Sequence, residues 1–279
     1  MTRMYVMAPD LSKPAVDTHF HVFAAHQAQP GARYVPCYDA PLAAWQAAAV
    51  PLGVRRGVLV QTSFLGTDNT LLLDTLAQHR DALRGIAVVA PTADAQTLAP
   101  LHAAGVRGIR LNLAGASHDL TAWRGATALW DALAALGWHL ELHTDIGRLP
   151  GVITQLPAAL PLAIDHMGKP DAVVAHDATV QALATRARRA PVHIKLSGAY
   201  RLGGLDAGAL ARLWLAELGP GRLLWGSDWP CTNHEAHADY PALWHALDDW
   251  LRDAAAAQAA RVGNPHRLYW GAPVGLNQS

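Results

Sequence analysis

The sequence contains little cysteine, no excess of either charge and no long hydrophobic run. Its 279 residues include two cysteines, Cys37 and Cys231, so a framework of disulfide bonds is excluded. Basic and acidic residues balance at 22 each, which argues against nucleic acid or an anionic membrane as the main partner. No apolar run reaches the roughly 20 residues that a transmembrane helix needs. Residues 1–14 have neither an apolar core nor a small-residue cleavage site, so we expect no signal peptide and a cytoplasmic location.

Hydrophobic residues, by contrast, are abundant. They make up 51% of the chain, against 16% charged residues, so much of the chain should be buried. The length suits one α/β domain with a substantial core, spanning residues 1–279 without a visible linker. Histidine is also frequent, with 15 residues. Those in helical or loop contexts are expected to be ordinary surface residues: His79, His102, His118 and His176.

Apolar segments rich in β-branched residues alternate with helical patterns along the chain. Strands are predicted at 15–21, 56–62, 84–90, 107–113, 138–143, 160–165, 192–197 and 223–228. Helices are predicted at 43–49, 71–80, 92–104, 121–136, 149–156, 179–189, 207–218 and from 240 onward. This alternation implies parallel strands. Eight units within about 250 residues favour a (β/α)8 TIM barrel over an open sheet, and the lack of a glycine-rich dinucleotide motif also disfavours the open sheet.

Polar residues gather where these strands end. His19 and His21 are two apart in the first strand, so both imidazoles point to the same face. Further polar residues follow at the ends of later strands: Gln61, Ser63, Arg110, Asn112, Glu141, His143, Asp165, His166, Lys195, Ser197, Arg201 and Asp228. A barrel collects these ends at one mouth, where active sites lie. His139 and His193 come early in their strands and are expected in the core or the barrel floor, and Trp225 and Trp229 are expected to pack.

Several motifs together resemble a known family. They are His19-x-His21, His143, Asp165-His166-Met167-Gly168-Lys169-Pro170 and Trp225-Gly226-Ser227-Asp228-Trp229-Pro230, with Tyr34 and the segments 60–63, 66–69, 107–110 and 264–270. From about Pro14 to Trp270 the chain resembles the amidohydrolase superfamily, of the amidohydrolase 2 type. Within it, the similarity is to the pyrone-dicarboxylate lactonases and related lactone hydrolases.

The resemblance implies an enzyme that opens the lactone ring of a small carboxylated substrate, of the 2-pyrone-4,6-dicarboxylate or muconolactone type, with an activated water. Asp228 would be the general base. His19, His21 and His166 would polarise the carbonyl or stabilise the oxyanion. The substrate-binding residues would be Arg110 and Arg201, which suit carboxylates, together with Tyr34 and Ser63. For Arg110, an ion pair inside the barrel, for instance with Glu141, is the alternative.

Two positions depart from the lactonase pattern. His143 stands where the pyrone-dicarboxylate lactonases, described as metal-free, carry a tyrosine. It completes the set His19, His21, His143 and Asp228, which resembles the set that binds one divalent ion in metal-dependent members, and such ligands suit Zn²⁺. We therefore expect one divalent metal, zinc, with a metal-free site as the alternative. Ala116 replaces an additional arginine, so the substrate should carry fewer or different anionic groups.

Other functions remain open at this stage. One is a metal-dependent decarboxylase of an aromatic acid in the same superfamily, another a hydrolase of a sugar lactone, and a third a non-catalytic barrel that binds an organic acid. Asp228 beside the histidines disfavours the third, because a carboxylate does not help to bind an anion. The expected partner is a small molecule; the sequence leaves open a homo-oligomer, the particular lactone and the direction of the reaction.

Overall fold

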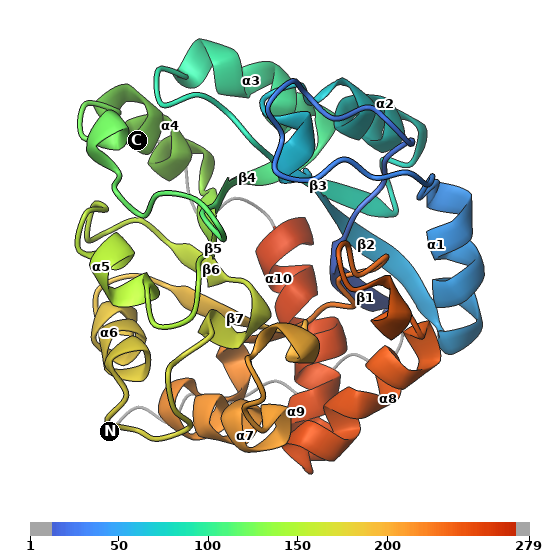
Figure 1. The fold of residues 1–279 in the computed structure, drawn as a ribbon, viewed down its shortest axis with the longest axis vertical. Coiled ribbons are helices and arrows are strands. Elements are labelled where there is room, and N and C mark those ends of the chain that lie inside the picture. Colours follow the sequence, from blue (N-terminus) through green and yellow to red (C-terminus); the bar gives the residue numbers. More distant parts are fainter. Residues whose placement is uncertain (1–12, 272–279) are drawn as a thin grey trace, which may run out of the picture.

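The computed structural model describes residues 13–271 and shows eight parallel strands in sequential order (Figure 1). The strands are β1 Ala15–Phe20, β2 Val54–Val60, β3 Leu83–Ala87, β4 Val106–Asn112, β5 His139–His143, β6 Leu162–Ile164, β7 Val192–Leu196 and β8 Leu223–Trp225. Each predicted strand is present. The predicted (β/α)8 barrel is therefore confirmed.

Most of the helices form a ring outside the strands, and α10 lies in the centre of that ring (Figure 1). The helices are α1 Leu42–Ala49, α2 Thr70–Gln78, α3 Ala95–Ala104, α4 Thr127–Leu136, α5 Leu149–Ile153, α6 Ala178–Ala187, α7 Ala207–Leu218, α8 Tyr240–Leu251, α9 Ala254–Gln258 and α10 Asn264–Trp270. The predicted starts of two helices, residues 92 and 121, lie before the observed starts at Ala95 and Thr127. Helix α3 starts at Ala95 because the side chain of Asp94 accepts a hydrogen bond from the amide of Thr97, which caps the helix there. Residues 121–123 form a separate 3₁₀ turn before α4.

Backbone contacts join the first strand to the segment after the last one. The amide of His21 donates to the carbonyl oxygen of Trp229 at 2.9 Å, and the amide of Asp228 donates to the carbonyl oxygen of His19 at 2.8 Å. Asp17, which is fully buried, accepts hydrogen bonds across this seam from both the amide and the hydroxyl of Ser227. The seam thus places Asp228 against the end of β1.

The opposite end of the barrel is closed by α10, which lies in the centre of the ring in Figure 1. Its Tyr269 is buried in a cluster with Val16, Val58 and Ile86. His139 is 2% exposed, and its ring lies 5.5 Å from that of Tyr269, as expected for a residue of the barrel floor. His193 is 8% exposed and also belongs to the core, as predicted.

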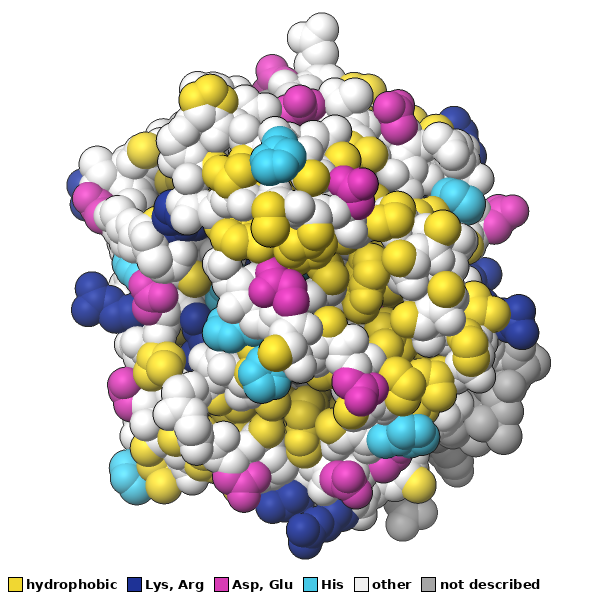
Figure 2. All heavy atoms as spheres, turned by 45° about the vertical axis from the view of Figure 1, so that its right-hand side comes forward, with side chains coloured by type: hydrophobic (Ala, Val, Ile, Leu, Met, Phe, Trp, Pro, Cys, Tyr) yellow, Lys and Arg dark blue, Asp and Glu magenta, His cyan; other side chains and the backbone are white. Residues whose placement is uncertain are grey.

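The outer surface mixes basic, acidic and hydrophobic side chains (Figure 2), in keeping with the zero net charge. In the described part of the chain, no helix is long and apolar enough to cross a membrane. Both cysteines are free thiols. The expected absence of a signal peptide concerns residues 1–14, of which 1–12 lie outside the described residues. The cytoplasmic location stays a prediction.

Candidate active site

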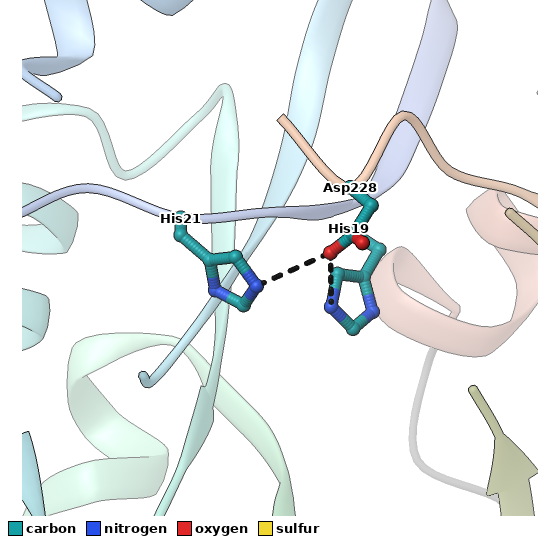
Figure 3. A group of neighbouring side chains, drawn as sticks. All are labelled: His19, His21 and Asp228. Carbon is teal, nitrogen blue, oxygen red and sulfur yellow. Dashed lines mark ion pairs between the residues drawn. The ribbon is translucent and has the colours of Figure 1, made fainter. Parts of the chain in front are cut away.

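The centre of the site is formed by His19, His21 and Asp228 (Figure 3). His19 and His21 lie at the end of β1 and just after it, and Asp228 follows β8. The Nε2 atoms of both imidazoles lie 3.5 Å from Oδ1 of Asp228. All three residues are at most 5% exposed. The predicted meeting of these residues at the barrel mouth is therefore present in the structure.

His21 and Asp228 are each held in place by further hydrogen bonds outside the centre. The Nδ1 atom of His21 lies 2.8 Å from the carbonyl oxygen of Val60. A carbonyl only accepts, so Nδ1 carries a proton, and the Nε2 atom of His21 faces Asp228. On the other side, Oδ2 of Asp228 accepts from the hydroxyl of Tyr200 at 2.7 Å and from Nε of Arg201 at 2.8 Å. Oδ1 is thereby left to face the imidazoles.

These contacts keep Asp228 ionised. Burial alone would raise its pKa, but Arg201, the nearby His166 and the hydrogen bond with His21 hold the pKa of Asp228 well below its usual range. For His19, burial is the dominant effect and lowers the pKa to about 3. The centre therefore combines an anionic carboxylate with a neutral imidazole at physiological pH.

His166 joins this centre from the end of β6. Its ring lies 5.1 Å from that of His19, and its Nε2 lies 3.9 Å from Oδ2 of Asp228. Nδ1 is hydrogen-bonded to the hydroxyl of Ser197 at 3.0 Å. Burial lowers the pKa of His166 well below its usual value. This places a second neutral imidazole beside the carboxylate, and His166 lies at the centre where the sequence predicted it.

His143 lies next to His166, with the two rings 4.6 Å apart. Its Nδ1 is 3.4 Å from Nη2 of Arg110. Arginine only donates, so Nδ1 must accept, and the proton of the neutral ring is then on Nε2. That buried Nε2 has no hydrogen-bond partner among the described residues. In this arrangement His143 offers a donor rather than a lone pair, and its role as a metal ligand stays a prediction.

A layer of buried charges lies beneath the centre. Arg110 contacts Asp165 through Nε at 3.0 Å, and Lys195 forms a close ion pair with Glu141. The Nδ1 atom of His19 lies 3.1 Å from Nζ of Lys195 and 3.2 Å from Oδ1 of Asp165. Both tautomers of His19 therefore have a partner, and these charges hold its ring in place.

The substrate-binding residues that the sequence singled out have other partners in the structure. Arg110 forms an ion pair inside the barrel, which was the alternative to a substrate contact. Its closer partner is Asp165 at 3.0 Å, and Glu141 lies 3.7 Å away. The hydroxyl of Tyr34 donates to Glu235 at 2.9 Å. Ser63 is exposed and begins a 3₁₀ turn. Substrate contacts by Arg110, Arg201, Tyr34 and Ser63 stay predictions.

Two residues near the centre were missed by sequence reasoning. Tyr200 hydrogen-bonds to Asp228, but its position 28 residues earlier in the chain gives no pattern that links the two. Lys169 lies in the motif around His166 but received no role. It is 7% exposed, three residues after His166.

The centre fits a divalent metal. One ligand atom from each of His19, His21 and Asp228 lies within 4.8 Å of the others, and all three are buried. The Nε2 atom of His19 has no hydrogen-bond partner among residues 13–271. Two imidazoles and one carboxylate that leave a position open are a donor set typical of catalytic zinc. A second group, His19, Asp165 and His166, shares His19 with the first.

Comparison with known sequences places these residues in a family context. The family model for amidohydrolases matches residues 16–270. A 2-pyrone-4,6-dicarboxylate hydrolase of Comamonas testosteroni is 33% identical over 278 residues, covering 92% of this chain and 90% of the relative. A 4-sulfomuconolactone hydrolase of Rhizobium radiobacter is 31% identical over 276 residues, covering 93% and 91%.

Solved structures show the same architecture. A probable 2-pyrone-4,6-dicarboxylic acid hydrolase from Acinetobacter baumannii, with citric acid bound, superposes with a TM-score of 0.82 at 30% identity, covering 92% of this chain and 100% of the other. A zinc-bound amidohydrolase from Burkholderia multivorans has a TM-score of 0.69 at 21% identity, covering 92% and 99%. This second similarity concerns the fold alone.

Proposed function

The chain belongs to the amidohydrolase family, and on that premise we propose that it hydrolyses the lactone ring of a small acidic substrate. The resemblance predicted from the motifs is thereby confirmed at the level of the family. The observation that carries the proposal is the buried Asp228 carboxylate, which faces His19 and His21 at 3.5 Å and has His166 beside it.

In the reaction, Asp228 acts as the general base. A water beside Oδ1 transfers a proton to the carboxylate as its oxygen attacks the carbonyl carbon of the lactone. Neutral imidazoles next to this position donate hydrogen bonds to the oxygen that becomes anionic. The ring C–O bond then breaks, and the proton on Asp228 passes to the leaving oxygen. The product carries a new hydroxyl group and a new carboxylic acid, which releases its proton to the solvent.

We further propose that a single divalent ion, zinc, is held by His19, His21 and Asp228, whose ligand atoms lie within 4.8 Å of one another. His143, which the sequence predicts as a further ligand, lies outside this group and carries a proton on Nε2 in the present arrangement. Such an ion supplies a Lewis acid that lowers the pKa of water and polarises a carbonyl. Independently of the ion, Tyr200 and Arg201 orient the carboxylate through Oδ2, so that Oδ1 faces the reacting atoms.

The substrate class follows from the named relatives. The substrates in their names, 2-pyrone-4,6-dicarboxylate and 4-sulfomuconolactone, are both acidic lactones. We propose a lactone with at least one carboxylate or sulfonate for this chain as well. Arg110 and Arg201 lie near the centre and give it a positive environment, although each also contacts a carboxylate of the protein.

A panel of lactones tests the proposal. Pyrone dicarboxylate, muconolactones, a sulfonated muconolactone and sugar lactones are incubated with purified enzyme, and acid release is followed with a pH indicator. We expect turnover of at least one acidic lactone. Carbon dioxide release from an aromatic carboxylate, with no acidic lactone turned over, would instead support the decarboxylase alternative.

A further inference from the structure

The arginines assigned to substrate carboxylates already contact carboxylates of the protein. Arg110 contacts Asp165 through Nε and Nη2, both at 3.0 Å. Arg201 donates from Nε to Asp228 at 2.8 Å and from Nη2 to the backbone oxygen of Thr232 at 2.9 Å. An acidic group of the substrate would have to compete with these internal partners, and breaking a buried ion pair is costly.

Lys169 is a cation near the centre without such a partner. It is 7% exposed, and in the described part of the chain no carboxylate oxygen lies within 4.0 Å of its ammonium group. Burial lowers the pKa of Lys169 to about 8; Asp145 opposes this effect and Arg201 adds to it. At pH 7 the amine therefore remains mostly protonated. A buried charge without a close counter-ion is unfavourable, and an anionic ligand would relieve this cost.

The backbone holds Lys169 in a sharp turn that begins at His166. Residues 166–169 all have positive φ, including 49° at His166 and 45° at Lys169, so the chain turns sharply after β6. Such angles are costly for residues other than glycine and persist only where the surrounding structure imposes them. The carbonyl of Lys169 accepts from the amide of Gly147 at 3.0 Å, which ties the turn to the loop after β5.

The charge of Lys169 acts on both sides of this turn. It contributes to lowering the pKa of His143, which lies beside His166 at the centre. It also contributes to lowering the pKa of His118, which lines a cavity of about 660 Å³ between the loops after β4 and β5. Lys169 therefore lies close enough to act electrostatically on the reaction centre and on a residue of this cavity.

We propose that the ammonium group of Lys169 binds an acidic group of the substrate, a carboxylate or a sulfonate, at the rim of the centre. An ammonium group is a compact charge with three donors, so it accommodates either anion. This inference rests on the proposed lactone hydrolysis for the identity of the ligand. In this proposal Lys169 pairs with the acidic group of the substrate, whereas Arg110 and Arg201 pair with carboxylates of the protein.

Binding of citrate tests the inference without catalysis. Citrate is a tricarboxylate probe whose dissociation constant is measured by calorimetry. We expect Lys169→Met to weaken citrate binding by about tenfold or more, because a charge-assisted hydrogen bond is lost. Lys169→Arg keeps the charge and should stay within about threefold of the wild type. The matched control is Lys13→Met, which makes the same substitution just before β1, at the other end of that strand from His19.

Kinetics with acidic lactones and their methyl esters provide the second readout. For the acidic lactone, Lys169→Met should raise KM by about tenfold or more with kcat within about threefold, because the interaction is made equally in ground and transition states. The KM of the methyl ester should not change. A larger effect on carboxylated or on sulfonated lactones identifies which acidic group Lys169 binds.

Unchanged citrate binding and an unchanged KM in Lys169→Met would overturn the inference. Should this variant fail to fold, as judged by its urea midpoint, Lys169→Gln takes its place with the same criteria. If the wild type turns over no lactone, the proposed function fails, whereas citrate binding still tests Lys169. The two ideas can therefore fail separately.

Discussion

Two layers of polar side chains fill the carboxyl end of the barrel, and they differ in how they are paired. In the lower layer, Arg110 pairs with Asp165 and Lys195 pairs with Glu141. Buried atoms without a hydrogen-bond partner among the described residues occur in both layers. In the lower layer they are Oε1 of Glu141 and Oδ1 of Asp165, which still lie within 3.7 Å of a nitrogen of Arg110 or Lys195. In the upper layer they are the Nε2 atoms of His19 and His143, which have no such cation beside them. Buried polar atoms are rarely left without partners. The comparison indicates that the lower layer positions side chains, whereas the upper layer is completed by ligands.

Replacing His19 or His21 of the upper layer should have the largest effect on function. For His19→Asn and His21→Asn we expect kcat/KM to fall by about 10²-fold or more, because carbonyl polarisation and a metal ligand are lost together. Elemental analysis of purified protein should show the metal content falling from about one equivalent to less than about a tenth. Full metal content in both variants would contradict the proposed ligand set.

Removing a charge from the lower layer should instead affect stability. Lys195→Met leaves Glu141 buried without its close cation, which should cost about 3–5 kcal/mol of unfolding free energy. The urea midpoint measures this loss. The double variant Lys195→Met with Glu141→Gln should lose less than the sum of the two single variants, because no unpaired charge remains. Additive losses would show that the pair does not act as a unit.

The two layers should also make stability depend on pH. Burial depresses the pKa values of five histidines in the folded protein: His19, His139, His143, His166 and His193. Their contribution to the free energy of unfolding is fully present above pH 6.5, the pKa of histidine in the unfolded chain, and is lost as the pH falls below 6.5. Glu141 and Asp17, whose pKa values are raised mainly by burial, act in the opposite direction.

Between pH 6.5 and pH 5 the unfolded chain should therefore bind more protons than the folded one, so the free energy of unfolding should fall as the pH falls. Urea unfolding at pH 7, 6 and 5 measures this slope. A free energy of unfolding that is constant between pH 7 and 5 would contradict the buried, neutral state of these histidines.

Replacing His143, which lies beside both layers, should have the smallest effect on kcat/KM. If its Nε2–H only donates a hydrogen bond, His143→Gln should lower kcat/KM by about tenfold and retain the metal. If His143 is a metal ligand, as the sequence predicts, the metal content should fall with the activity. Long-range ¹⁵N–¹H spectra of the imidazoles report independently whether Nε2 of His143 carries the proton.

Much of the fold could be predicted because each strand is a short apolar run between turn residues. The parallel pairing follows from the helices in between. The ends of helices were less predictable, because a cap such as Asp94 competes with the propensity of the residues before it. His19 and His21 were predictable as a pair because strand geometry places residues i and i+2 on one face.

The partners of these residues could not be read from the sequence. The contacts of Asp228 with Tyr200 and Arg201 join separate loops, and the choice of Arg110 between Asp165 and Glu141 depends on side-chain directions inside the barrel. Lys169 was missed for a related reason. Its importance lies in the absence of a close counter-ion in the described part of the chain, and a missing contact leaves no pattern in the sequence.

The most direct test of the central claim, that Asp228 is the general base for lactone hydrolysis, is kcat/KM of Asp228→Asn on the best acidic lactone. Asparagine keeps the shape of the side chain but cannot take the proton from water. We predict a loss of about 10²–10⁴-fold, the contribution usual for general base catalysis. Turnover within about threefold of the wild type would contradict the account.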